Sequence, residues 1–230
     1  MLVHSDDDGV LSFKSVMKRL LFFVFSLWLL MPVMEAHGKS LPKQLEKEYN
    51  KRLKEYRKGN WKIPDDINNF EEALLKHFER IVSLGKDNYE ILVVSTVLNS
   101  EAVDHNYTLS IACANYSRQA SNILQEDLMP QMSVNGMDPL AGLEQFYARY
   151  QQILEKEIKE EMVESYSIFR CLNPDSDEEK EYEMQTVFIL NDGEGSKIRL
   201  KALEQALQES ESLEPYSNEI IELFKNSSLR

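Results

Sequence analysis

Beyond residue 38 the chain holds only two cysteines and two histidines, few groups for nucleophilic, redox or metal chemistry. In an oxidising compartment Cys113 and Cys171 are a candidate disulfide. Such a bridge would stabilise the fold by about 4 kcal/mol on the chain-entropy model. The alternative is that each is a small buried hydrophobic residue, because Cys113 lies between alanines and Cys171 follows Phe169 closely. Neither cysteine has a histidine nearby in sequence, so a nucleophilic role is not favoured.

The two histidines give no convincing metal site. Glu101 and His105 are four residues apart and would share one face of a helix, a spacing that some metal ligands use. No His-Glu-x-x-His motif and no Glu-x-x-His pair accompanies them. A solvated or capping His105 is therefore the favoured interpretation, and we predict no catalytic, cofactor-binding or metal-binding residue.

Two segments have the composition of ligand loops but the wrong order of residues. Segment 188–197 contains Gly-Ser-Lys, whereas a phosphate-binding loop needs Gly-Lys-Ser or Gly-Lys-Thr. The acidic segment from Asp175 resembles a calcium loop, but Lys180 stands at its sixth position and Thr186 at its twelfth, where Gly and Glu are needed. Both segments are predicted to be ordinary loops, over 175–183 and 191–196.

Residues 17–38 have the order of parts of a secretory signal peptide. Lys18 and Arg19 precede an apolar run over 20–31, and a short polar region ends in small residues at Ala36 and Gly38. The run is about a dozen residues, well short of the roughly 20 that cross a bilayer. We therefore expect an exported protein, periplasmic or secreted, that is cleaved after Gly38 or Ala36; an uncleaved signal anchor is the alternative.

Residues 1–16 do not fit such a signal. A cluster of three aspartates at 6–8 precedes the basic residues, and negative charge there opposes insertion. Translation starting at Met17 is the favoured explanation, and a long n-region is the alternative.

Charge is distributed unevenly along a chain whose net charge is −13. Residues 39–62 carry nine Lys/Arg against three Glu, or +6, whereas residues 63–230 carry 14 basic and 32 acidic residues, or −18. The acidic balance argues against nucleic acids, which need cationic partners, and against anionic membranes. A basic arm of this kind is attracted to its own acidic domain or to an acidic partner.

The basic segment, 39–60, is predicted to be an amphipathic helix. Its apolar residues recur every three or four positions and form one stripe: Leu41, Leu45, Tyr49, Leu53 and Tyr56. Ser40 is a suitable N-cap, and Gly59 suits a left-handed position after the last turn. The stripe is expected to dock on the rest of the domain or to bind a partner.

The remainder, 63–230, is predicted to be an acidic domain built mainly from helices. Glycine and proline are scarce, and 87–129 contains neither, which favours a helix broken near Asn106, with Asp87 and Glu90 as a capping box. Further helices are expected from Asp65 or Asp66 to Gly85 and over 138–172, 197–210 and 215–225. The fold class is thus mainly α, a single domain of five to seven helices. The alternative is α+β, with strands near 91–98 and 184–190.

Three functions remain open on this basis. The favoured one is an exported, non-catalytic binding or interaction protein with an unidentified protein partner, no cofactor, no nucleic acid and no membrane span after cleavage. The second is an envelope or surface assembly factor bound through the basic helix. The third is a hydrolase-like enzyme whose acidic site is formed by residues distant in sequence.

Overall fold

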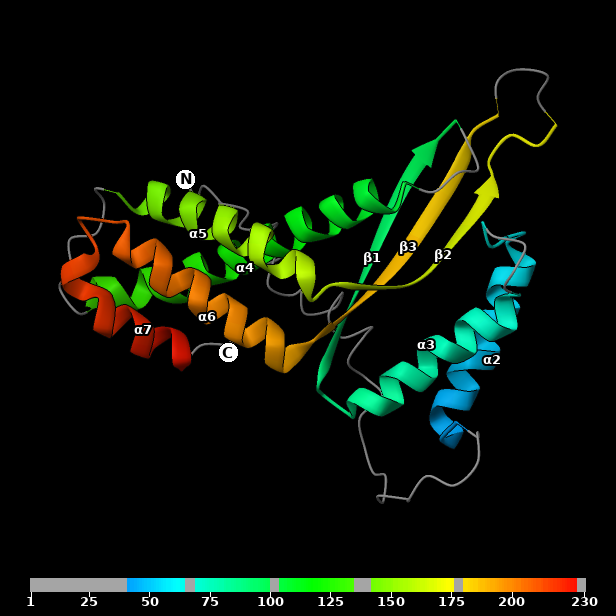
Figure 1. Ribbon diagram of the computed structural model, residues 1–230, viewed down its shortest axis with the longest axis horizontal. Coiled ribbons are helices and arrows are strands. Elements are labelled where there is room, and N and C mark those ends of the chain that lie inside the picture. Colours follow the sequence, from blue (N-terminus) through cyan, green and yellow to red (C-terminus); the bar gives the residue numbers. More distant parts are fainter. Residues whose placement is uncertain (1–40, 65–68, 100–103, 135–141, 176–179, 227–230) are drawn as a thin grey trace, which may run out of the picture. The chain divides into compact units, whose positions relative to one another are not determined.

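The computed structural model describes residues 41–64, 69–99, 104–134, 142–175 and 180–226. This part of the chain is mainly α-helical, with a three-stranded antiparallel sheet (Figure 1). The elements follow in the order α2 (Lys43–Lys58), α3 (Phe70–Leu84), β1 (Tyr89–Leu98), α4 (His105–Val134), α5 (Leu143–Glu157), η1 (Ile158–Glu160), β2 (Val163–Cys171), β3 (Tyr182–Asn191), α6 (Asp192–Gln208), η2 (Glu214–Tyr216) and α7 (Ser217–Lys225).

Strand β3 is the centre of the sheet, whose order is β1-β3-β2. Its apolar run is buried on both faces, because successive side chains point to opposite sides. Phe188 and Leu190 belong to one hydrophobic cluster, whereas Val187 and Ile189 belong to another. Each face of the sheet must therefore be covered by helices.

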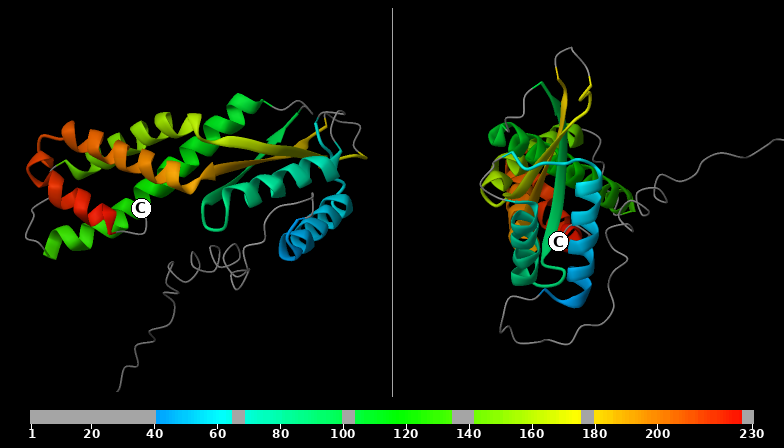
Figure 2. Two further views of the ribbon diagram at one scale, coloured as in Figure 1. Left: turned by 60° about the horizontal axis from the view of Figure 1, so that its bottom comes forward. Right: turned by 90° about the vertical axis from the view of Figure 1, so that its right-hand side faces the viewer.

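Helices α4 to α7 build the larger cluster together with one face of the sheet. Tyr150 and Leu154 of α5 and Leu203 of α6 are among its fully buried side chains. Figure 2 shows these helices gathered beyond one end of the sheet, where β2 and β3 lead into them.

Helices α2 and α3 cover the opposite face of the sheet. Leu53, Leu74, Phe78 and Ile81 form the smaller cluster with residues of β2 and β3. The remaining residues of the α2 stripe pack against this cluster: Leu41, Leu45, Tyr49 and Tyr56. The apolar side of the basic helix thus contacts its own domain.

The expected helix over 91–98 is wrong, because these residues form most of β1. No turn residues follow this run, and none are needed, because β1 is not part of a hairpin: it pairs with β3, from Tyr89 opposite Asn191 to Leu98 opposite Tyr182. The turn lies before the strand, where Gly85 and Asp87 have φ of 82° and 65°. Asp87 and Glu90 therefore form no capping box.

The single helix expected over 138–172 is also wrong. Helix α5 and the short η1 end by Glu160, and β2 follows from Val163. Met162, Tyr166 and Phe169 have helical spacing, but a bulge between Glu164 and Tyr166 shifts the alternation of the strand and hides it in the sequence.

Smaller differences lie at the ends of elements. The loop expected over 191–196 is the first turn of α6, since the Asn191 side chain accepts the Glu194 N–H at 3.1 Å. After α2 the positive φ is at Asn60, at 55°, whereas Gly59 has φ −83°. The expected cap Ser40, the start at Asp65 or Asp66 and the signal segment fall outside the described residues.

Replacing Leu45 and Leu53 together by Asp should lower the free energy of unfolding by at least about 3 kcal/mol, because two apolar side chains leave the cluster and two charges enter it. Thermal denaturation measures the effect. The control, Lys47→Asp with Lys54→Asp, places the same residues on the exposed face of α2 and should change the melting temperature little. Equal effects would contradict the packing of the stripe.

Candidate interaction surface and polar clusters

Five lysines form a single ridge along the solvent side of α2, called here the lysine ridge: Lys43, Lys47, Lys51, Lys54 and Lys58. With about 100° of turn per residue, they fall within an arc of about 80°. The centre of this arc lies opposite the apolar stripe. Docking the stripe on the domain therefore directs all five ammonium groups to solvent.

The lysine ridge has no acidic partner within the described residues. Arginines of α2 are paired, Arg52 with Glu48 at 3.1 Å and Arg57 with Glu71, but none of the five lysines makes an ion pair with described residues. All five are exposed. Over the helix the ridge extends about 22 Å at 1.5 Å per residue. It is a row of uncompensated positive charge on an acidic domain.

Arg199 of α6 is at the centre of a buried polar cluster. Its side chain is 5% exposed, and Nη1 donates to Glu90 of β1 at 2.8 Å and to the Tyr116 hydroxyl of α4. Nη2 donates to Ser196 at 2.8 Å and lies 3.4 Å from Asp192. Two carboxylates and one guanidinium thus satisfy one another where β1, α4 and α6 meet.

Residues next to this cluster are affected by it, in the space around Gly195 and in the pKa of Tyr116. A Cβ at Gly195 would lie 3.2 Å from the Tyr116 hydroxyl, so glycine leaves room for that hydroxyl beside the first turns of α6. Burial raises the pKa of Tyr116, with Glu90 adding to the effect and Arg199 opposing it. The guanidinium is thus held by two carboxylates and two hydroxyls, and the cluster ties α6 to β1 and α4.

A second buried pair links α3 with the bulge in β2. His77 is 1% exposed, and its Nδ1 lies 2.8 Å from Ser165 Oγ. Its Nε2 is buried and has no hydrogen-bond partner among the described residues. The rings of Phe78 and Tyr166 contact it edge-on.

This histidine is neutral near pH 7. Burial, together with the positive charge of Arg52, lowers the pKa of His77 to about 4. With no acceptor near Nε2, the tautomer with its proton on Nδ1 is favoured, and Nδ1 then donates to Ser165. In that arrangement His77 does not remove the serine proton, so the pair lacks the geometry of an activated nucleophile.

His105, at the start of α4, contacts Glu164 with its Nδ1 at 2.7 Å. The other oxygen of Glu164 accepts from Ser167 at 2.7 Å, and Ser167 lies 2.9 Å from Thr186. The carboxylate stands between the imidazole and the hydroxyl, so this histidine does not touch the serine. The partner considered for it in the sequence, Glu101, falls outside the described residues.

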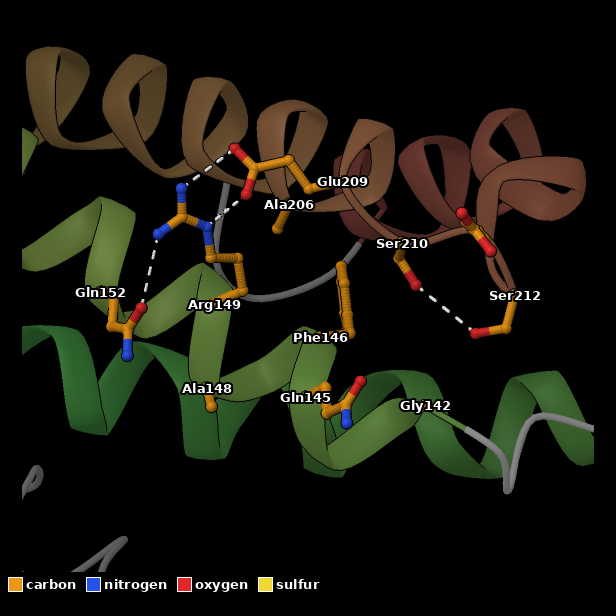
Figure 3. A pocket seen from close by; sticks show the side chains of 11 residues that line it. Gly142, Gln145, Phe146, Ala148, Arg149, Gln152, Ala206, Glu209, Ser210 and Ser212 are labelled. Atoms are coloured by element: carbon orange, nitrogen blue, oxygen red, sulfur yellow. Dashed lines mark hydrogen bonds and ion pairs between the residues drawn. The ribbon is translucent and has the colours of Figure 1, made fainter.

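An open groove runs between α5 and α6 (Figure 3). Phe146 and Ala206 line it, and Arg149 reaches across it to both carboxylate oxygens of Glu209. Hydrogen bonds from Arg149 hold the pKa of Glu209 below its usual range. The groove is therefore bridged by a satisfied ion pair that ties the two helices.

Cys113 and Cys171 are both free thiols in the structure. Cys113 is buried in α4, and burial raises its pKa to about 11. Cys171 is the last residue of β2, half-buried, with Sγ 3.8 Å from the Asn173 side chain. The disulfide between them stays a prediction.

Within the described ranges no group of three potential ligand side chains could hold a metal ion, and no helix has the length and apolarity needed to cross a bilayer. Comparison with protein-family models, with curated proteins and with solved structures gives no match.

Sequence reasoning identified the apolar stripe but did not single out the face that the lysines form opposite it. Their spacing of four, four, three and four residues is visible in the sequence and signals a single face. The clusters around Arg199 and His77 give no such signal, since their members come from elements far apart in the chain.

The burial of His77 predicts a pH dependence of stability. Unfolded histidine titrates near pH 6.5, so between that value and about pH 4 the unfolded chain binds the proton and the folded chain does not. Stability should fall by roughly 3 kcal/mol as the pH drops through this window. Denaturation of His77→Leu should lack this component, whereas His105→Leu, at an exposed site, should keep it. An identical slope in both variants would contradict a neutral buried His77.

Thiol labelling separates the two states of the cysteines. The predicted disulfide would leave no reactive thiol in denatured, non-reduced protein. Free cysteines, as the structure has them, would give two thiols there, with Cys171 labelled and Cys113 unreacted in the native protein at pH 8, because burial keeps the Cys113 thiol protonated. A count of zero in denatured protein would establish the disulfide instead.

Proposed function

We propose that the chain is an exported, non-catalytic interaction protein that binds an acidic protein surface through the lysine ridge. The observation that carries the proposal is the row of five exposed lysines, none of them ion-paired within the described residues, on a domain that is otherwise strongly acidic. Such a row is complementary to carboxylates spaced along a helix or strand of a partner.

Two other polyanions fit less well. Nucleic acids and anionic bilayers are extended, so residues 63–230, at −18, would also face them and repel them. Insertion of α2 into a bilayer would need its apolar stripe, and that stripe packs against α3 and the sheet. A compact acidic protein can contact the ridge without approaching the rest of the domain.

The same packing weakens the second hypothesis, an assembly factor held by the apolar side of this helix. For the third hypothesis, a hydrolase-like enzyme, the polar clusters of the described residues contain carboxylates that are ion-paired with Arg199 and a neutral histidine, His77. Of the three hypotheses, binding of a partner through the basic face of α2 is the one that the geometry supports best.

The test is affinity capture of the mature protein's partner from its native compartment, followed by binding of that purified partner to charge-reversed variants. Lys47→Glu, Lys51→Glu and Lys54→Glu together should weaken binding by at least about tenfold, and binding to the unmodified protein should weaken as salt increases. Poly-glutamate is a defined acidic probe for the same measurement.

The matched control reverses three exposed lysines elsewhere: Lys156, Lys159 and Lys180. Its net charge equals that of the ridge variant, so a loss of binding confined to the ridge variant identifies the face. Equal losses in both variants, or tighter binding to a DNA duplex or to phosphatidylglycerol vesicles, would reject the proposal.

A further inference from the structure

The two edges of the sheet differ in how they are covered. The outer edge of β2 is paired at one position, because Phe169 exchanges backbone hydrogen bonds of 2.7 and 2.8 Å with Lys62, in the segment that joins α2 to α3. No described residue pairs with the outer edge of β1. Strand β1 is therefore the open edge in the part of the chain that the structure describes, and Figure 1 shows it at one side of the sheet.

The register indicates which backbone groups of β1 face outward. The Asp192 N–H donates to the Asn88 carbonyl at 3.0 Å, so these opposed residues are a directly hydrogen-bonded pair at the end of the β1–β3 ladder. Bonded and non-bonded pairs alternate along an antiparallel ladder. It follows that even-numbered residues of β1 turn their N–H and C=O to β3, whereas Val93, Ser95 and Val97 turn theirs to the open edge.

The side chains of this edge lack the usual protection against pairing. Val93 is 53% exposed and Val97 is 58% exposed, and both lie on the same face of the strand. From residue 91 to residue 98 β1 contains no charged residue and no proline. Exposed edge strands that do not pair usually carry a lysine, a proline or a bulge.

We propose that β1 pairs with β1 of a second copy of this chain, antiparallel and centred on Ser95, to make a continuous six-stranded sheet. Ser95 lies opposite Ser95 of the second copy, and Val93 lies opposite Val97. These three outward-facing residues form six backbone hydrogen bonds across the twofold axis. On the other face Val94 meets Thr96 and Leu92 meets Leu98.

The pattern of residues selects a second copy over an unrelated strand. The segment 92–98 is nearly symmetric in character about Ser95, because Leu92 lies opposite Leu98 and Val93 opposite Val97, with the β-branched pair Val94 and Thr96 beside the central hydroxyl. Antiparallel pairing about Ser95 also places the two Glu90 side chains at opposite ends of the new ladder, so these like charges do not face each other. The interface is isologous, as a closed dimer requires.

The first experiment measures the mass of the mature protein by sedimentation over a range of concentrations. The unmodified protein should be a dimer that dissociates on dilution, and Val93→Lys with Val97→Lys should be a folded monomer. The control, Val82→Lys with Leu172→Lys, adds the same charges at two other exposed apolar sites, each 44% exposed, and should remain a dimer.

The second experiment tests the register. Residues of a hydrogen-bonded antiparallel pair have Cα atoms about 5.5 Å apart, inside the roughly 4.4–6.8 Å that a disulfide spans. In a Cys171→Ser background, Ser95→Cys should give a covalent dimer on mild oxidation. Val93→Cys should not, because its opposite residue is Val97.

The lysine ridge contributes nothing to this interface, so reversing its charges should leave the dimer intact, and failure of one proposal leaves the other standing. A monomer at every concentration, a dimer that survives the β1 lysines, or cross-linking of Val93→Cys in preference to Ser95→Cys would overturn the inference. Dissociation of both lysine double variants would do the same.

Discussion

Burial of β3 on both faces is the constraint on which the rest of the structure depends. Its side chains alternate between two hydrophobic clusters, so a single layer of helices would leave half of them in water. Helices that precede the sheet in sequence and helices that follow β1 together cover its two faces. Helix α4 and the start of α6 pack on one face, in a cluster that α5 and α7 complete, whereas α2 and α3, which come before the first strand, cover the other.

The position of the basic helix follows from that constraint. Its apolar stripe completes the smaller cluster beside Phe78 and Ile81, and the stripe's geometry then directs the opposite side of the helix to solvent. The lysine ridge is thus a consequence of packing. The five lysines form one exposed surface because the opposite, apolar side of α2 is packed against α3 and the sheet.

The two helical layers are fixed to the sheet by different means. Arg199 joins α6 to β1 through an ion pair with Glu90 and to α4 through the Tyr116 hydroxyl, and losing Glu90 would leave the buried guanidinium with Asp192, 3.4 Å away, as its one counter-charge among the described residues. The layer of α2 and α3 relies on apolar and aromatic contacts and on the backbone exchange between Lys62 and Phe169. That exchange pairs the outer edge of β2 at Phe169, whereas the outer edge of β1 has no partner among the described residues. The two edges of the sheet therefore differ.

By itself the sequence determined the features that depend on local spacing: the amphipathic helix over α2, most of α3, the C-terminal helices and the polarised charge. Tertiary structure decided the strands. The β-branched run in β1 satisfies helical and extended patterns alike, and only pairing with β3, some 90 residues later, supplies the hydrogen bonds that make the strand the better choice. The bulge in β2 removed the alternation that would have revealed that strand. The groups around Arg199 and His77 also converge only in three dimensions, because packing, which no single sequence displays, brings distant elements together.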